Sequence, residues 1–154
     1  HLQLAGFKLQ IDDNTIHIMS NTKSILPVNM TTQVYPGFPT DLQAQWMALM
    51  TQANGPSIIT ENIYADRFTH IPELSRFGAH INLVNNKAYI KGNDVLFAAP
   101  VMSTDIRSSA SLIISALATK GRSTISRIYH IDRGYEHIDV KLSTLGADIC
   151  RVNE

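Results

Sequence analysis

The sequence contains the same series of motifs twice in the same order, and this internal repeat restricts the fold more than any other feature. Thr40-Asp41-Leu42 in the first copy corresponds to Thr104-Asp105-Ile106 in the second, and Asp66-Arg67 corresponds to Asp132-Arg133. The differences in length between the copies fall in segments that are predicted to be loops. Both copies should therefore fold into the same supersecondary unit.

The beginning of the chain matches only the end of such a unit. Leu4 through Ile18 corresponds to the segment near Phe77 through Ile90. We therefore expect the chain to be a fragment of a longer protein that starts inside a repeat. The predicted division is the tail of one repeat over residues 1–27, a second repeat over 28–91 and a third over 92–154.

Hydrophobic spacing and turn residues predict the elements of each unit. Alternating apolar residues around Asp and Asn turns predict hairpins over 7–18 and 79–91. Single strands are predicted over 28–34, 57–60, 123–128 and 147–152, and helices over about 40–54, 71–77, 104–119 and 135–145. Thr40 and Gln43 have the spacing of a capping box at the start of the first helix.

The two longest predicted helices carry almost no charge. The 40–54 helix has no charged residue after Asp41, and the 104–119 helix has none after Arg107. An amphipathic surface helix would show a charged face, whereas a helix without one is expected to be buried. Both helices should therefore lie largely in the interior.

Charged groups gather twice where a predicted strand ends and a helix begins. The first such corner is Ile63 to Phe68, and the second is Ile128 to Glu136, with His130, Asp132 and Arg133. Unpaired N–H groups at a helix start favour anions, and strand-to-helix junctions often carry binding groups in α/β proteins. These corners are the predicted functional region.

Composition limits the partners and the compartment. Thirteen basic residues balance thirteen acidic ones, so no net field attracts the chain to nucleic acid or to a membrane, and any basic site must be local. No apolar run is long enough to cross a membrane. The single cysteine, Cys150, excludes an internal disulfide and fits a reducing, cytoplasmic compartment; we expect it to be buried in the last strand.

Four ordered motifs resemble the C-terminal part of the UDP-N-acetylglucosamine 1-carboxyvinyltransferases, a family of enolpyruvyl transferases. The motifs are YPGFPTDLQAQ (35–45), TENIY with RF (60–64 and 67–68), TDIRSSASL (104–112) and RIYHIDRGYE (127–136). The resemblance extends over almost the whole chain. The related shikimate-phosphate enolpyruvyl transferase has the same fold and is less similar, since it has lysine where this chain has Arg133.

The resemblance implies an α/β fold of a particular kind. Each of two domains would be an inside-out α/β barrel made of three βαβαββ repeats, with buried helices inside mixed sheets, and this chain would be a partial domain. The implied reaction moves the enolpyruvyl group of phosphoenolpyruvate to the 3-hydroxyl of UDP-N-acetylglucosamine and releases phosphate, which begins peptidoglycan synthesis. It requires no metal and no organic cofactor.

The resemblance also assigns candidate site residues. Asp41 corresponds to the family's carboxylate at the sugar 3-hydroxyl, where it serves in proton transfer. Arg67, Arg107 and Arg133 correspond to arginines around phosphoenolpyruvate, with Arg133 grouped with Asp41 as catalytic. Ile63 corresponds to a position whose backbone contacts the UDP-sugar. Bidentate guanidinium groups suit both the carboxylate and the phosphate of phosphoenolpyruvate.

Each of these residues also has a purely structural interpretation. Asp41 is acidic in a first helical turn, where the helix dipole favours it, and Asp105 occupies the equivalent place in the next unit. The arginines are able to form surface salt bridges with Asp66 and Asp132, and the Ile63 side chain suits a core. Glu61 is either an acid that supports the site from behind or a solvated residue at a strand end, and we favour the solvated residue.

Two departures from the family pattern affect the functional hypothesis. Ala65-Asp66 replaces the family's usual Glu-Asn, and the family's reactive cysteine loop, lysine–asparagine pair and a further arginine all belong upstream of His1. This chain would form one wall of the cleft, would need the enzyme's N-terminal domain, and should be nearly inactive alone. The alternative is a repeat-built binding domain that has lost the chemistry.

Overall fold

The computed structural model describes residues 1–19, 24–93 and 95–152. The strands are β1 (Lys8–Ile11), β2 (Ile16–Met19), β3 (Met30–Thr31), β4 (Ser57–Thr60), β5 (Ile81–Val84), β6 (Lys87–Ile90), β7 (Pro100–Met102) and β8 (Thr124–Ser126). The α-helices are α1 (Gln43–Met50), α2 (Ile71–Arg76), α3 (Ile106–Leu117), α4 (Tyr129–Asp132) and α5 (Ile138–Thr144), and the 3₁₀ helices are η1 (Thr40–Leu42) and η2 (Ala65–His70).

The middle of the chain forms a mixed sheet with the strand order β3-β4-β6-β5. β3 is parallel to β4, while β4 and β5 are both antiparallel to β6. Together with α1 and α2, the element order from β3 to β6 is βαβαββ. In the register, Ile59 of β4 faces Ala88 of β6, and both side chains are fully buried.

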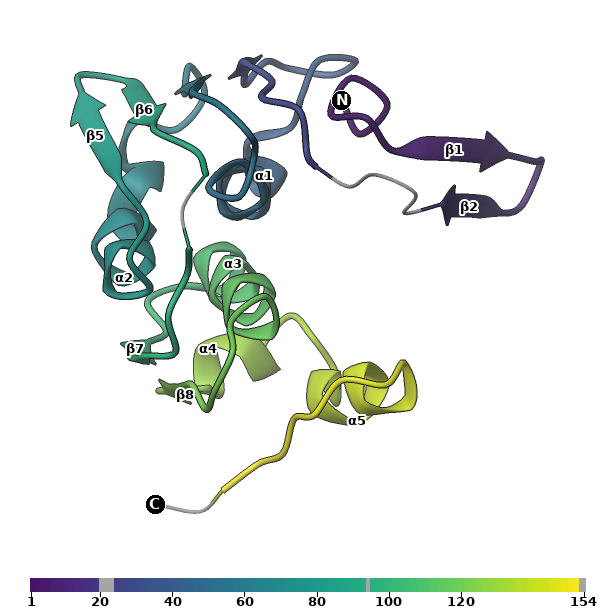
Figure 1. The fold of residues 1–154 in the computed structure, drawn as a ribbon, viewed down its shortest axis with the longest axis vertical. Coiled ribbons are helices and arrows are strands. Elements are labelled where there is room, and N and C mark those ends of the chain that lie inside the picture. The colour runs from purple at the N-terminus through teal and green to yellow at the C-terminus, as the bar shows by residue number, and fades with distance from the viewer. Residues whose placement is uncertain (20–23, 94, 153–154) are drawn as a thin grey trace.

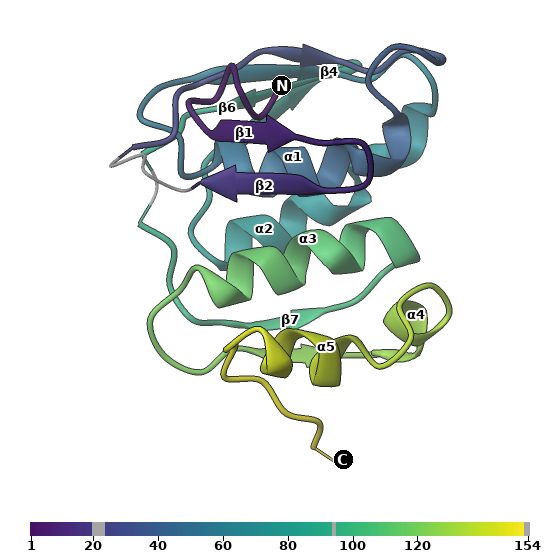
Figure 2. The ribbon, with the colours of Figure 1, turned by 90° about the vertical axis from the view of Figure 1, so that its right-hand side faces the viewer.

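Two smaller sheets flank this one. β1 and β2 form the predicted antiparallel hairpin, and β7 pairs in parallel with β8. Helices α1, α2 and α3 lie between the mixed sheet and the β7–β8 pair, as both views show (Figure 1, Figure 2). This arrangement confirms the prediction that the long neutral helices are enclosed by sheets.

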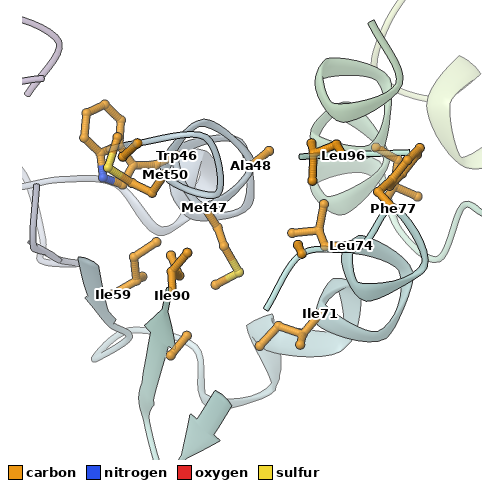
Figure 3. Packing of buried hydrophobic residues seen from close by; sticks show 14 of the residues in the cluster. Trp46, Met47, Ala48, Met50, Ile59, Ile71, Leu74, Phe77, Ile90 and Leu96 are labelled. Atoms are coloured by element: carbon orange, nitrogen blue, oxygen red, sulfur yellow. The ribbon is translucent and has the colours of Figure 1, made fainter. Parts of the chain in front are cut away.

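The core is centred on α1. Six of its residues are buried, and α1 packs closely against α3, in which seven residues are buried. Figure 3 shows Met47 extending from α1 toward Ile90 of the sheet and toward α2, where Leu74 is also buried, as is Phe77 directly after the helix. Burial of each such side chain contributes about 1.5–3 kcal/mol.

The predicted capping box at Thr40 is wrong. No side chain caps η1 or α1, and both polar atoms of the buried Gln43 side chain lack a hydrogen-bond partner among the described residues. The second copy does have a capping box, in which Asp105 accepts from the N–H of Ser108 at 3.0 Å. Asp105 therefore has the structural role of a helix cap. Asp41, at the equivalent place in the first copy, caps no helix, and its carboxylate is available for other contacts.

The predicted strand over 147–152 is also wrong. These residues form no regular structure, and Cys150 is exposed. A strand requires a neighbouring strand to pair with, and no described strand lies beside this segment. The predictions for strands 28–34 and 123–128 and for helices 40–54 and 135–145 are right in type and too long, since the structure has β3, β8, α1 and α5 there.

None of the helices over the described residues has the length and apolarity that would take it across a membrane. Over the same residues, no group of three or more His, Cys, Asp and Glu side chains is arranged to hold a metal ion.

Candidate functional site

Three of the predicted site residues meet at one ion-pair cluster. The Nε of Arg107 lies 2.9 Å from Oδ1 of Asp41, and its Nη2 lies 3.3 Å from Oδ2. Arg67 reaches the same carboxylate with Nη2, 3.4 Å from Oδ1. We call Asp41, Arg67 and Arg107 the Asp41 cluster. The salt bridge that the structural interpretation assigned to Arg67 and Asp66 is absent; Arg67 pairs with Asp41 instead.

Parallel strand pairing brings these residues together. Asp41 follows β3 and Arg67 follows β4, which are parallel neighbours, so the segments after them leave the sheet at the same edge. Arg107 follows β7, and Arg133 follows its parallel neighbour β8. Binding groups in α/β proteins gather at the carboxyl ends of parallel strands for this reason.

The Asp41 cluster is open to solvent and carries a net positive charge. The Asp41 side chain is 54% exposed and that of Arg107 43%, whereas Arg67 is only 14% exposed. The hydrogen bond to Asp41 raises the pKa of Arg107 above its ordinary value. Within this cluster two guanidinium groups face one carboxylate, and the half-exposed Arg107 presents its positive charge to solvent.

The N-terminal turn of α3 adds a second carboxylate. Burial alone would raise the pKa of Asp105, but hydrogen bonds from Ser108 and from the N–H of Arg107 outweigh burial, so this pKa lies below its ordinary value. Because the Asp105 carboxylate receives the first N–H groups of α3, the start of the helix that carries Arg107 is fixed.

Arg133 lies close to this turn, and its side chain makes no hydrogen bond or ion pair with any other described residue. Its neighbour Gly134 packs so tightly on Ile106 that a Cβ atom would come within 2.7 Å of Cγ2. Figure 2 shows α4, which Arg133 follows directly, beside the N-terminal end of α3. The structure thus brings the exposed Arg133 near Arg107 without joining it to the Asp41 cluster.

Asp132 pairs with a different arginine from the one that the structural interpretation assigned. Nη1 and Nη2 of Arg151 lie 3.0 and 2.5 Å from its two carboxylate oxygens, and Nε of Arg151 lies 3.0 Å from Asp139. These hydrogen bonds raise the pKa of Arg151. Arg133 therefore remains free of the salt bridge with Asp132 that was considered for it.

Ile63 is at a surface position. Its side chain is 44% exposed, and it lines a shallow depression of about 580 Å³ with Asn62, Thr32 and the 33–37 loop. The core interpretation of its side chain is therefore wrong. The Ile63 N–H donates to Oε1 of Glu61 at 2.8 Å, so a backbone contact with a ligand would use its carbonyl group.

A buried histidine supports the Arg67 corner from behind. His70 is fully buried, and its Nδ1 lies 3.0 Å from the carbonyl oxygen of Arg67. Because a carbonyl only accepts, Nδ1 carries the proton and Nε2, which is buried without a partner among the described residues, is the bare nitrogen. Burial lowers the pKa of His70 from 6.5 to about 4, so the ring is neutral near pH 7.

Comparison with known proteins gives this arrangement a family. The model of the EPSP synthase family, described as 3-phosphoshikimate 1-carboxyvinyltransferase, matches residues 1–142. The chain belongs to the EPSP synthase family.

Curated relatives in this family share about half of the residues. Proteins named UDP-N-acetylglucosamine 1-carboxyvinyltransferase are 51% identical over 147 residues in Pelodictyon phaeoclathratiforme and 54% identical over 153 residues in Geotalea daltonii. These matches cover 96% and 99% of the chain but 34% and 36% of the relatives. The chain therefore spans about a third of the length of the curated relatives it matches.

Solved structures of the family have the same fold. The enolpyruvyl transferase NikO from Streptomyces tendae superposes with a TM-score of 0.91 at 28% identity, over 99% of this chain and 35% of NikO. An EPSP synthase from Acinetobacter baumannii superposes with a TM-score of 0.78 at 16% identity, over 99% of this chain and 38% of its own, and shows the shared fold alone. The predicted fold class is confirmed: this is a partial enolpyruvyl transferase fold.

Sequence reasoning missed one feature of this EPSP synthase family site. Glu61, predicted to be solvated, is 2% exposed and accepts four hydrogen bonds, from Thr32, Thr40, Ile63 and Tyr64. Two of these donors are the nearby backbone N–H groups of Ile63 and Tyr64, but the two hydroxyl donors, Thr32 and Thr40, lie 29 and 21 residues away in the sequence and give no local signal of burial.

Proposed function

We propose that this chain forms part of an enzyme that transfers the enolpyruvyl group of phosphoenolpyruvate to the 3-hydroxyl of UDP-N-acetylglucosamine and releases phosphate. The observation that carries the proposal is the solvent-facing carboxylate of Asp41 between Arg67 and Arg107. Its support from comparison is the shared name of relatives 48–54% identical over nearly the whole chain.

Asp41 acts as the base in this proposal. The sugar hydroxyl must lose its proton as its oxygen attacks C2 of the enolpyruvyl group, while C3 gains a proton. A carboxylate within hydrogen-bond reach of the hydroxyl accepts that proton. The exposure of Asp41 leaves room for a hydroxyl to approach, and the two arginines fix its orientation.

The arginines bind the anionic substrate in this proposal. Phosphoenolpyruvate carries a phosphate and a carboxylate, and the adduct formed by attack at C2 collapses by losing phosphate from C2 and a proton from C3, which restores the double bond. Arg67, Arg107 and Arg133 surround that charge, and Arg133, which has no competing partner among the described residues, is the one free to bind an anion directly. The Ile63 backbone contacts the UDP-sugar through its carbonyl group.

The rest of the enzyme supplies the other wall of the cleft. The chain spans about a third of its relatives, and we assign residues 28–91 and 92–154 to two successive repeats of one domain, with 1–27 as the end of a preceding one. The N-terminal domain of the same enzyme completes the site. The described residues of the second unit support this division, since β3 to β6 follow the order βαβαββ.

The cellular role follows from the reaction. Formation of enolpyruvyl UDP-N-acetylglucosamine is a step of peptidoglycan synthesis, so we place the enzyme in the cytoplasm, in cell wall construction and thereby in cell shape and division. No metal, organic cofactor, nucleic acid or membrane is required for the proposed reaction.

A comparison of acceptors tests the proposal. The full-length protein that contains this chain should release phosphate from phosphoenolpyruvate with UDP-N-acetylglucosamine and not with shikimate 3-phosphate. Shikimate 3-phosphate is the alternative acceptor because the matching family is described as 3-phosphoshikimate 1-carboxyvinyltransferase. Phosphate release with shikimate 3-phosphate alone would reassign the acceptor, and binding of UDP-N-acetylglucosamine without turnover would favour the non-catalytic binding domain.

A further inference from the structure

Glu61 connects the two halves of the first corner. It directly follows β4, and its Oε1 accepts from the Thr32 hydroxyl at 2.6 Å and from the N–H groups of Ile63 and Tyr64 at 2.8 and 3.0 Å. Its Oε2 accepts from the Thr40 hydroxyl at 2.9 Å. No cation pairs with it among the described residues, so these four donors are what stabilises the buried carboxyl group.

Thr40 transmits this arrangement to the Asp41 cluster. Its hydroxyl has one proton, which it donates to Glu61, so its lone pairs are free to accept. The Nε of Arg67 donates to that oxygen at 3.2 Å, and Nη2 of Arg67 then points at Asp41. A continuous chain of hydrogen bonds therefore runs from the buried Glu61 through Thr40 and Arg67 to Asp41.

The Arg67 guanidinium needs such a support because few other groups hold it. Its CZ atom lies 4.9 Å from the centre of the Tyr64 ring, and the Tyr64 N–H is itself held by Glu61. The contact of Arg67 with Asp41 is the longest in the Asp41 cluster, at 3.4 Å. Without the Thr40 hydroxyl, the side chain would keep only the ring and this weak ion pair.

We propose that Thr40 and Glu61 are positioning residues that hold Arg67 against Asp41. The inference rests on the proposed function, because it concerns the arginine and the base of that reaction. Glu61 acts only through Thr40 and the Ile63–Tyr64 backbone, since it is itself buried. Thr40 sets the direction of the guanidinium group and thereby the place where the substrate anion binds.

Matched variants of the full-length enzyme test the role of Thr40. Thr40→Val should lower kcat/KM roughly 10- to 100-fold, because a hydrogen bond to a charged group is lost. Thr40→Ser, which keeps the hydroxyl, should restore it to within about threefold. Thr51→Val is the control: it removes a fully buried hydroxyl that bonds only the Ala48 carbonyl, and it should lower stability while leaving kcat/KM unchanged.

Glu61 is tested in the same way. Glu61→Gln keeps the shape of the side chain, but its amide N–H₂ group would face neighbours that all donate hydrogen bonds. This variant should therefore lower kcat/KM as much as Thr40→Val does. Glu73→Gln is its control, since Glu73 is a buried carboxyl on α2 that accepts from the Met102 N–H at 2.8 Å. Equal effects of the two glutamine variants on kcat/KM would overturn the role of Glu61.

A double-mutant cycle separates positioning from general loss of structure. In an Arg67→Lys background, which lacks Nε, Thr40→Val should have less than about a twofold further effect. Losses that simply multiply would overturn the proposal, because Thr40 would then act independently of Arg67.

The wild-type assay separates this inference from the function on which it rests. A wild-type enzyme without enolpyruvyl transfer would refute both. A wild-type enzyme with normal transfer, together with a Thr40→Val variant as active as Thr51→Val, would refute the positioning role alone.

Discussion

The carboxylate of Asp41 is held by two arginines that reach it in different ways. Arg107 uses Nε and Nη2 on both oxygens, at 2.9 and 3.3 Å, whereas Arg67 uses Nη2 alone. A bidentate guanidinium group fixes the plane of a carboxylate, and a lysine, with a single ammonium centre, does not. We therefore expect Arg107 to determine the orientation of the base.

Arg107→Lys tests this difference at the level of a single residue. It keeps the charge but loses the planar fork, and kcat/KM of the full-length enzyme should fall by roughly 10- to 100-fold. Arg76→Lys is the matched control, because Arg76 is an exposed arginine that pairs with Glu73 on α2. The account is wrong on this point if steady-state kinetics place both lysine variants at the wild-type level.

His70 makes the Arg67 corner sensitive to acid. Its pKa is about 4 in the folded protein and 6.5 as a reference, so the folded state binds fewer protons between these values. The stability that comes from the neutral ring is complete above pH 6.5 and is lost as pH falls toward 4. The total change is ~3 kcal/mol.

Removing the titrating ring should flatten this dependence. The amide of His70→Asn does not titrate in this range, and it is expected still to donate to the Arg67 carbonyl. The free energy of local unfolding of residues 65–76 should therefore change less between pH 7 and pH 5 in this variant than in wild type. Native-state hydrogen exchange on the full-length protein measures it. His17→Asn, at an exposed position on β2, is the control, and an unchanged pH dependence in His70→Asn would contradict the assignment.

At the scale of elements, the site depends on where strands end. β3 and β4 leave the mixed sheet side by side, and β7 and β8 leave their own sheet in the same way, so the four segments that carry the candidate site residues come from two parallel pairs. Close backbone packing occurs where β6 ends. After β6, Gly92 passes so near the turn after α1 that a Cβ atom would lie 2.1 Å from the Gly55 oxygen.

Two glycine substitutions separate packing from backbone conformation. Gly92 and Gly146 both have positive φ, at +71° and +95°, but a Cβ atom on Gly146 would meet nothing within 4 Å. Gly146→Ala should cost about 1–2 kcal/mol of unfolding free energy from the left-handed conformation alone. Gly92→Ala should cost clearly more, and equal shifts in denaturant midpoint would refute the close approach.

Sequence patterns predicted the elements whose information is local. The missing charges in α1 and α3 indicated burial, and the Asp and Asn turns indicated both hairpins; each prediction is confirmed. The strand predicted at 147–152 failed, because apolar alternation does not reveal whether a partner strand exists. The capping box at Thr40 failed because its hydroxyl bonds Glu61, far away in the sequence.

The site was predictable to a similar extent. The family motifs predicted that Asp41, Arg67 and Arg107 belong to one site, and the structure brings them together. The TENIY motif contains Glu61 but does not indicate its burial, and no motif contains His70; the burial of both residues comes from tertiary packing. The role of Arg133 stays a prediction, because its side chain makes no hydrogen bond or ion pair with Asp41, Arg67 or Arg107.

At the scale of the whole molecule, helices α1, α2 and α3 fill the space between sheets (Figure 2), and the Asp41 side chain is 54% exposed. The β1–β2 hairpin lies apart from the helices and exposes Ile11, Ile16 and Ile18. The chain spans about a third of its relatives. We accordingly expect turnover only from the full-length enzyme, with the described residues alone nearly inactive.

Single-turnover phosphate release by full-length Asp41→Asn, compared with wild type and with Asp66→Asn, tests the central claim most directly. Asparagine keeps the shape of Asp41 and cannot take the hydroxyl proton, so the rate should fall by roughly 100- to 10,000-fold. Asp66→Asn, which changes an exposed acid one residue from Arg67, should match wild type. Phosphate release by Asp41→Asn at the wild-type rate would contradict the account.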